Sequence, residues 1–216
     1  MKFYYLLIPI LIGLVTGVVS GTIPMDSNDS KIFTVSKLIE NGSPIMGNPN
    51  APITILEWGD YQCTFCYKFH QNTLDIIKED FVKTGEVKII FKDFPLNGLD
   101  SKLAAEATYC AQDQDKYWEY HDELYKNWGG ERTGWITRES LEKFAMTIDL
   151  NLKEFNDCLD DHTYKDRVNT HYQFGKELGI DATPSFLVFN GEKIIKIRGN
   201  QPLDVFLKTF DELGVK

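Results

Sequence analysis

Strand-like segments lie near the two ends of this 216-residue chain. Short runs rich in β-branched and aromatic residues occupy residues 53–58, 87–91 and 185–189, and residues 193–197 alternate in polarity. Between residues 99 and 178 the apolar side chains recur every three or four positions, which predicts helices. The expected order is β-α-β, a helical block, then β-β-α. This is an α/β layout in which a crossover joins two parallel strands.

The N-terminus carries a distinct apolar segment. Lys2 is followed by seventeen residues without a charge, and small residues precede Gly21. The run is short for a bilayer core about 30 Å thick and has the order of a signal peptide. An uncleaved membrane anchor is the alternative. In either case we expect an extracytoplasmic protein, exported or anchored to the outer face of the cell membrane, with residues 21–43 as a linker.

Charge narrows the range of partners. The chain has 23 Lys and Arg against 32 Asp and Glu, a net charge of −9 at pH 7. The acidic residues are spread along the sequence, and no basic patch is visible. We therefore expect no nucleic acid partner.

The motif Cys63-Thr64-Phe65-Cys66 lies where the first strand gives way to a helix. A helix N-terminus favours a thiolate over a thiol, so Cys63 is the expected exposed nucleophile. Cys66, one turn further, is the expected buried resolving thiol that closes the disulfide. A zinc site needs about four ligands, and the remaining cysteines lack the spacing for one. We expect no metal ion and no cofactor.

Two segments carry a family resemblance. Residues 47–66, which end in the dithiol motif, and Thr183-Pro184 before a strand resemble the DsbA family, in particular its membrane-anchored Gram-positive and archaeal members. The resemblance covers about residues 44–213 and implies a thioredoxin fold with an inserted helical domain. The expected parts are a first thioredoxin segment at 44–98, the insertion at 99–178 and a second thioredoxin segment at 179–216.

The resemblance also implies roles for individual residues. Pro184 is expected to form a cis bond beside the dithiol, leaving the backbone of Thr183 free to pair with an extended substrate. Thr64 and Phe65 are expected to contact substrate. Glu57 is expected to be a buried proton relay whose pKa is raised by desolvation. The alternative for Glu57 is a surface charge at a strand edge.

Two further points concern single side chains. Phe65 occupies the position where the best-known family member has a histidine that stabilises the thiolate, so that protein's redox properties do not transfer to this chain. His70, one turn beyond Cys66, is expected on the surface. Cys110 and Cys158 both fall on apolar helix faces. In an exported chain with an even number of cysteines they favour a structural disulfide, and two buried inert thiols are the alternative.

The expected function is that of a thiol-disulfide oxidoreductase that introduces disulfides into unfolded or reduced exported proteins. By family analogy, a membrane partner of the DsbB or VKOR type would reoxidise it. A disulfide reductase or isomerase is the first alternative, and a chaperone-like module that binds peptides is the second. Isomerase relatives often carry an N-terminal dimerisation domain, for which residues 21–50 are too few. We also expect a monomer.

Overall fold

The computed structural model describes residues 22–23 and 33–215. The expected signal peptide or anchor at residues 1–20 lies outside the described residues. Among the described helices, none combines the length and the apolar character needed to cross a membrane.

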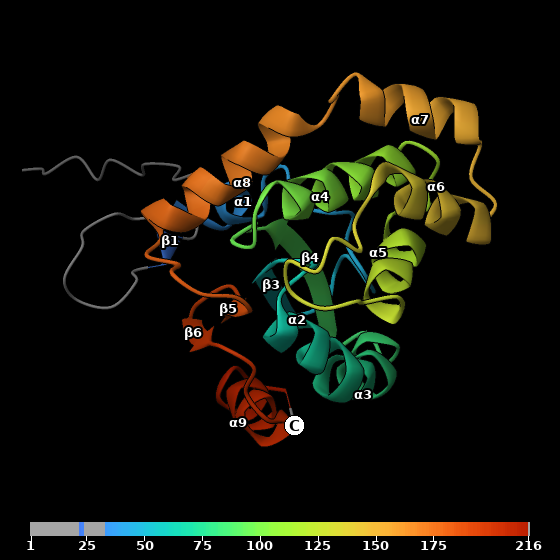
Figure 1. The fold of residues 1–216 in the computed structure, drawn as a ribbon. Coiled ribbons are helices and arrows are strands. Elements are labelled where there is room, and N and C mark those ends of the chain that lie inside the picture. Colours follow the sequence, from blue (N-terminus) through green and yellow to red (C-terminus); the bar gives the residue numbers. More distant parts are fainter. Residues whose placement is uncertain (1–21, 24–32, 216) are drawn as a thin grey trace, which may run out of the picture.

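A four-stranded mixed sheet forms the centre of the molecule, in the order β4-β3-β5-β6 (Figure 1). The strand β3 (Ile53–Gly59) pairs in parallel with β4 (Val87–Asp93) and antiparallel with β5 (Ser185–Phe189). The last strand, β6 (Ile194–Arg198), lies at the edge beside β5. Both interior strands are buried along their whole length, which explains their nearly continuous apolar sequence.

Helices cover both faces of this sheet. One face packs against α9 (Leu203–Glu212) and against a long helix that starts with α2 (Thr64–Phe69). This long helix continues through η1 (His70–Leu74), α3 (Asp75–Ile77) and η2 (Lys78–Val82). The other face packs against α1 (Val35–Ile39) and α8 (Lys165–Glu177). Successive side chains of β3 alternate between these two cores.

The helical block between β4 and β5 has its own core. It contains α4 (Leu99–Gln112), α5 (Tyr117–Lys126), α6 (Arg138–Thr147) and α7 (Leu152–Asp160). Their buried side chains form one cluster that also includes Cys63 and Cys66. The next helix, α8, precedes β5 in the sequence and so is part of the insertion. It packs both against α4 of the insertion and against β4 of the sheet.

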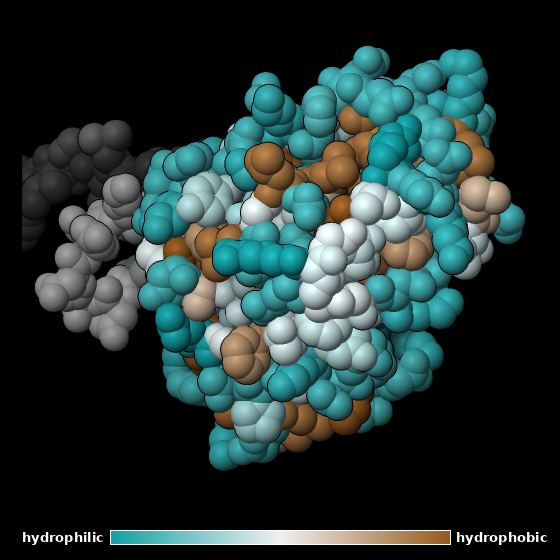
Figure 2. Space-filling view, viewed as in Figure 1, coloured by the Kyte–Doolittle hydropathy of each residue, from teal (hydrophilic) through white to brown (hydrophobic). Residues whose placement is uncertain are grey.

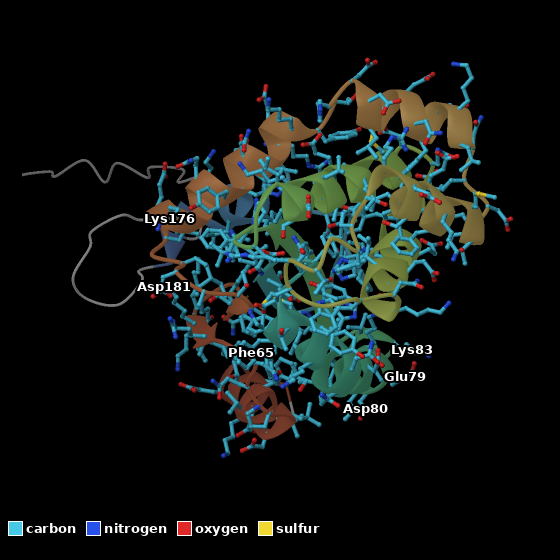
Figure 3. All side chains as sticks on the ribbon, in the orientation of Figure 1. Phe65, Glu79, Asp80, Lys83, Lys176 and Asp181 are labelled. Carbon is cyan, nitrogen blue, oxygen red and sulfur yellow. A yellow bond between two sulfur atoms is a disulfide. The ribbon has the colours of Figure 1, made fainter. Side chains whose placement is uncertain are left out.

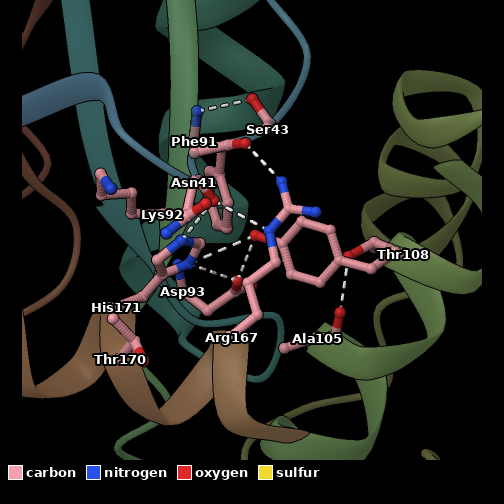
Figure 4. Close-up of polar contacts among 12 residues, drawn as sticks. Asn41, Ser43, Phe91, Lys92, Asp93, Ala105, Thr108, Arg167, Thr170 and His171 are labelled. Atoms are coloured by element: carbon pink, nitrogen blue, oxygen red, sulfur yellow. Dashed lines mark hydrogen bonds and ion pairs between the residues drawn. The ribbon is translucent and has the colours of Figure 1, made fainter. Parts of the chain in front are cut away.

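Part of the expected linker is folded onto the domain. The strand β2 (Phe33–Thr34) pairs with β1 (Thr22–Ile23), and Leu38 of α1 is fully buried. Figure 4 shows how the following residues are held: Nε of Arg167 donates to the carbonyl oxygen of Asn41 at 2.9 Å, and the Phe91 amide donates to Oγ of Ser43 at 2.9 Å. The linker prediction is therefore wrong for residues 33–43. The short apolar set Val35, Leu38 and Ile39, which packs α1 onto the sheet, follows a polar run that the sequence analysis extended too far.

The insertion contains a disulfide between Cys110 of α4 and Cys158 of α7, whose Cα atoms lie 5.8 Å apart. The bond matches the pairing favoured by the sequence. It joins the first and last of the four helices α4 to α7 and closes a loop with a sequence separation of 48 residues.

We predict that the double variant Cys110→Ala, Cys158→Ala is less stable by about 4 kcal/mol, since its unfolded chain gains loop entropy. Urea unfolding of oxidised wild type and variant measures the difference. Wild type and variant that are both treated with enough reductant to open every disulfide are the control, and their unfolding midpoints should be close to each other. An unchanged unfolding midpoint in the variant would contradict the prediction.

Candidate active site

The turn between β3 and α2 places the dithiol. The carboxylate of Asp60 is buried and accepts three backbone N–H groups, from Gln62 at 2.8 Å, Leu96 at 2.7 Å and Asn97 at 2.8 Å. These bonds tie the turn to the chain after β4. Cys63 follows in extended conformation as the N-cap of α2, so its side chain starts at the helix N-terminus.

Both active-site cysteines are free thiols and both are buried. Cys66 is fully buried, as expected, but Cys63 exposes only 5% of its surface. The expectation of an exposed Cys63 is therefore wrong. Its sulfur lies 3.4 Å from the carbonyl oxygen of Thr183, and the segment around Glu131 covers the start of α2. A substrate thiolate therefore has a narrow approach to this sulfur.

The surroundings of the two thiols give them different pKa values. Hydrogen bonds from the Cys66 thiol, the Thr183 side chain and the backbone N–H groups of Cys66 and Phe65 lower the pKa of Cys63 to about 7. Burial raises the pKa of Cys66, and the nearby sulfur of Cys63 and carboxyl of Glu57 raise it further. The thiolate is the reactive form of a cysteine. This difference fits a nucleophilic Cys63 and a resolving Cys66.

Glu57 lies on the interior strand β3, with Phe91 of β4 and Phe186 of β5 as its register neighbours. It is 1% exposed, so a surface charge at a strand edge is excluded. Burial raises the pKa of Glu57 to about 8, although the charge of Lys78 opposes this shift. In the described part of the chain, Oε1 of Glu57 has no hydrogen-bond partner. The carboxyl group is therefore largely protonated at pH 7.

The remaining expected residues surround the cysteines. The Thr183-Pro184 peptide bond is cis and directly precedes β5. Thr64 is half-buried, whereas Phe65 is 56% exposed. Figure 3 shows Phe65 on α2, on the viewed face of the molecule. Leu96, which is tied to the same turn, is 38% exposed. Figure 2 shows that apolar surface forms separate patches on this otherwise mostly polar face.

Sequence reasoning missed a loop that the insertion contributes to the site. Trp128 stacks on Tyr67 of α2 with ring centroids 4.6 Å apart, and its Nε1 donates to the carbonyl oxygen of Gln62 at 3.1 Å. The Arg132 amide donates to Oε1 of Gln62 at 2.9 Å. The carboxylate of Glu131 accepts the Thr64 amide at 2.8 Å. The glycine pair Gly129-Gly130 before Glu131 interrupts the helical spacing of the insertion, but no sequence signal indicates where this loop docks.

A buried histidine pair was also missed. His70 is 4% exposed, so its expected surface position is wrong. Its Nε2 lies 2.7 Å from Nε2 of His121, whose Nδ1 lies 2.8 Å from the Tyr61 hydroxyl. Burial lowers the pKa of both histidines, which keeps them neutral near pH 7. The π-type turn at the start of η1 places His70 on the inner side of the long helix.

These histidines and Asp122 carry ligand atoms within 4.8 Å of one another. However, Asp122 forms an ion pair with Lys78 at 2.9 Å, and the two imidazoles are close enough to hydrogen-bond directly. The contacts are those of a hydrogen-bonded cluster beside the dithiol.

A sheet of this order, with a dithiol at the start of the helix after β3 and a cis-proline before β5, defines the thioredoxin class of proteins. The thioredoxin family model matches residues 40–211. Disulfide bond formation protein D of Bacillus subtilis is 30% identical over 158 residues, which are 72% of this chain and 70% of that protein. The chain belongs to the DsbA family and is a thiol-disulfide oxidoreductase.

Solved structures agree with this assignment. Oxidised BdbD from Bacillus subtilis superimposes with a TM-score of 0.72 and 26% identity, over 81% of this chain and 94% of that one. The α-DsbA1 structure from Wolbachia pipientis gives a TM-score of 0.71 and 27% identity, over 81% and 91% of the two chains.

The raised pKa of Glu57 predicts how stability depends on pH. The folded state holds this proton up to about pH 8, whereas the ordinary pKa is 4.5, so this group makes folding less favourable as pH rises between the two values. Wild type should lose about 3 kcal/mol relative to Glu57→Gln between pH 5 and pH 7.5. Urea unfolding at both pH values measures the effect. Parallel pH curves for the two proteins would contradict it.

The lowered pKa of Cys63 predicts its reactivity. Alkylation of the reduced protein by iodoacetamide should be about tenfold slower at pH 6 than at pH 8, because the thiolate fraction falls through a pKa of about 7. In Cys63→Ser the remaining Cys66 should react far more slowly at both pH values, since it is fully buried. A midpoint near the ordinary cysteine pKa would show that the hydrogen bonds to Cys63 have no effect.

Proposed function

We propose that this oxidoreductase oxidises pairs of thiols in exported proteins, with Cys63 as the nucleophile and Cys66 as the resolving thiol. The observation that carries the proposal is the geometry of the site: Cys63 is the N-cap of α2, its Sγ lies 3.4 Å from the carbonyl oxygen of Thr183, and hydrogen bonds at the helix start stabilise its thiolate. Stabilising this thiolate stabilises the reduced enzyme, which makes its disulfide a stronger oxidant. The Bacillus relative that is named for disulfide bond formation supports the same direction of electron flow.

The reaction begins with the Cys63–Cys66 disulfide. A substrate thiolate attacks Sγ of Cys63, the bond to Cys66 breaks, and its electron pair remains on the Cys66 sulfur. The raised pKa of Cys66 favours protonation of this sulfur. Glu57 would supply the proton, because its buried carboxyl is largely protonated at pH 7 and lies close enough to raise the pKa of Cys66. The second substrate thiol loses its proton and attacks the substrate sulfur of the mixed disulfide. Cys63 leaves as a thiolate, and the substrate gains its disulfide.

The surface beside the dithiol supports an extended substrate. The backbone of Thr183 precedes β5 and lies within 3.4 Å of Sγ of Cys63. A peptide that pairs with this backbone would bring its cysteine to that sulfur. The exposed ring of Phe65 supplies apolar contact, and Thr64 lies between it and the nucleophile.

Reoxidation needs an external electron acceptor. We infer a membrane partner of the DsbB or VKOR type, whose disulfide the Cys63 thiolate attacks before Cys66 displaces the partner. An extracytoplasmic position at the membrane, with residues 1–20 as signal peptide or anchor, would bring enzyme and partner together. Glu57 would then accept the proton that Cys66 gives up.

We predict that Cys63→Ser abolishes dithiol oxidation and that Cys66→Ser accumulates mixed disulfides through Cys63, because the resolving thiol is missing. Mass spectrometry of adducts with a peptide that contains two cysteines identifies the linked residue. Cys110→Ala, Cys158→Ala is the control and should keep the dithiol chemistry. If Cys66 in Cys63→Ser forms adducts as fast as Cys63 does in Cys66→Ser, Cys63 is not the preferred nucleophile and the assignment is wrong.

The direction of electron flow is tested by the equilibrium of the Cys63–Cys66 pair with glutathione. We expect a reduction potential well above the value of about −270 mV typical of thioredoxin. A potential at or below that value would favour the reductase. Rapid reshuffling of a scrambled disulfide substrate at an intermediate potential would favour the isomerase.

A further inference from the structure

Glu131 contacts the active-site helix from a distant part of the sequence. Its Oε1 accepts the backbone N–H of Thr64 at 2.8 Å, across 67 residues. The docking of the surrounding loop on Gln62 and Tyr67, through Trp128 and Arg132, fixes this position. The contact is therefore part of a docked loop and does not depend on one exposed side chain alone.

The first N–H groups of the active-site helix are divided between two acceptors. The N–H groups of Phe65 and Cys66 stabilise the Cys63 sulfur, whereas the N–H of Thr64 binds Glu131. Thr64 directly follows Cys63 in the chain. A carboxylate and a thiolate therefore lie at the same helix end, and each negative charge disfavours the other.

The other charged groups do not neutralise this carboxylate. In the described part of the chain Glu131 forms no ion pair. The guanidinium of Arg132 points to the carbonyl oxygen of Leu96, and the ammonium of Lys68 lies over the Phe65 ring. Glu57 is fully buried and largely protonated at pH 7. No ion pair in the described part of the chain therefore offsets the charge of Glu131 at the start of α2.

We propose that Glu131 is a positioning residue that sets the redox balance of the dithiol. Its carboxylate, held on the Thr64 amide, limits the stabilisation of the Cys63 thiolate and makes the active-site disulfide a weaker oxidant than the same site without that charge. The proposal rests on the thiol-disulfide chemistry of Cys63 and Cys66. It adds that the inserted domain, through one loop, regulates a reaction that occurs in the thioredoxin part.

The test compares Glu131→Gln, Glu131→Ala and wild type. Gln keeps an oxygen that can accept the Thr64 amide but removes the charge, whereas Ala removes both. Glu139→Gln is the matched control, because Glu139 is an exposed acid in the first turn of α6, in the same insertion. Thiolate absorbance near 240 nm against pH gives the pKa of Cys63, and equilibration with glutathione at pH 8 gives the redox constant.

In Glu131→Gln we expect the pKa of Cys63 to fall by about half a unit and the redox constant to move about two- to fivefold toward the reduced enzyme. High salt should shrink both differences, since the interaction is electrostatic and near the surface. Glu139→Gln should match wild type. The redox constant of wild type in the same series tests the proposed function. The difference between wild type and Glu131→Gln tests the role of Glu131, so either proposal can fail without the other.

Two outcomes would overturn the proposal. If Glu131→Gln behaves as wild type while Glu131→Ala changes the pKa of Cys63 or the redox constant, Glu131 only holds the loop in place and its charge does not affect the dithiol. If neither variant shifts the pKa of Cys63 or the redox constant, or if Glu131→Gln raises the pKa, the carboxylate does not oppose the thiolate.

Discussion

Gln62 is the residue through which the two parts of the molecule fix the dithiol. Its side-chain amide donates to Oγ of Ser101 on α4 at 3.0 Å, and its side-chain oxygen accepts the Arg132 amide at 2.9 Å. Its backbone carbonyl accepts Nε1 of Trp128. A fully buried amide leaves its neighbours with unsatisfied groups if it is removed, and each such group costs about 1–3 kcal/mol. Because Gln62 directly precedes Cys63, the insertion cannot move away from the turn without disturbing the nucleophile.

Because of these contacts, the insertion forms part of the surroundings of the dithiol. Its core includes both cysteines together with the side chains of α4 to α7. Cys63 is consequently almost buried, at 5% exposure, although it stands at the start of a helix. The same cover removes water that would otherwise solvate the thiolate, so hydrogen bonds inside the protein take over that role. Access to the sulfur and its acidity are thus determined by the same contacts.

The sequence was informative where a local pattern determines structure. The runs at 53–58 and 87–91 predicted parallel strands, and the position of Cys63 and Cys66 directly after the first run predicted the dithiol at a helix start. The charge of Glu57 on an apolar strand left burial and a strand-edge position open, and the family resemblance favoured burial. The histidine pair and the loop of Glu131 were missed because their partners lie 51 and 67 residues away. Contacts between residues so far apart in the sequence produce no local sequence pattern. Without the fold, a single histidine or glutamate is therefore interpreted as a surface residue.

Among the described buried groups near the dithiol, the pKa of Glu57 is the one that suits the proposed proton relay. His70 and His121 are bases of suitable ordinary pKa, but burial lowers the pKa of each, and their ring nitrogens are engaged with each other and with Tyr61. A charge on either would place a cation in a low-dielectric region, which is unfavourable without a paired anion. Lys78 is the nearby cation that acts on Glu57 and on both histidines, and its ion pair with Asp122 reduces that influence. The pKa of Glu57 therefore stays near 8, close to neutral pH. A carboxyl group with this pKa can both release a proton to Cys66 when the disulfide opens and take it back when the disulfide forms.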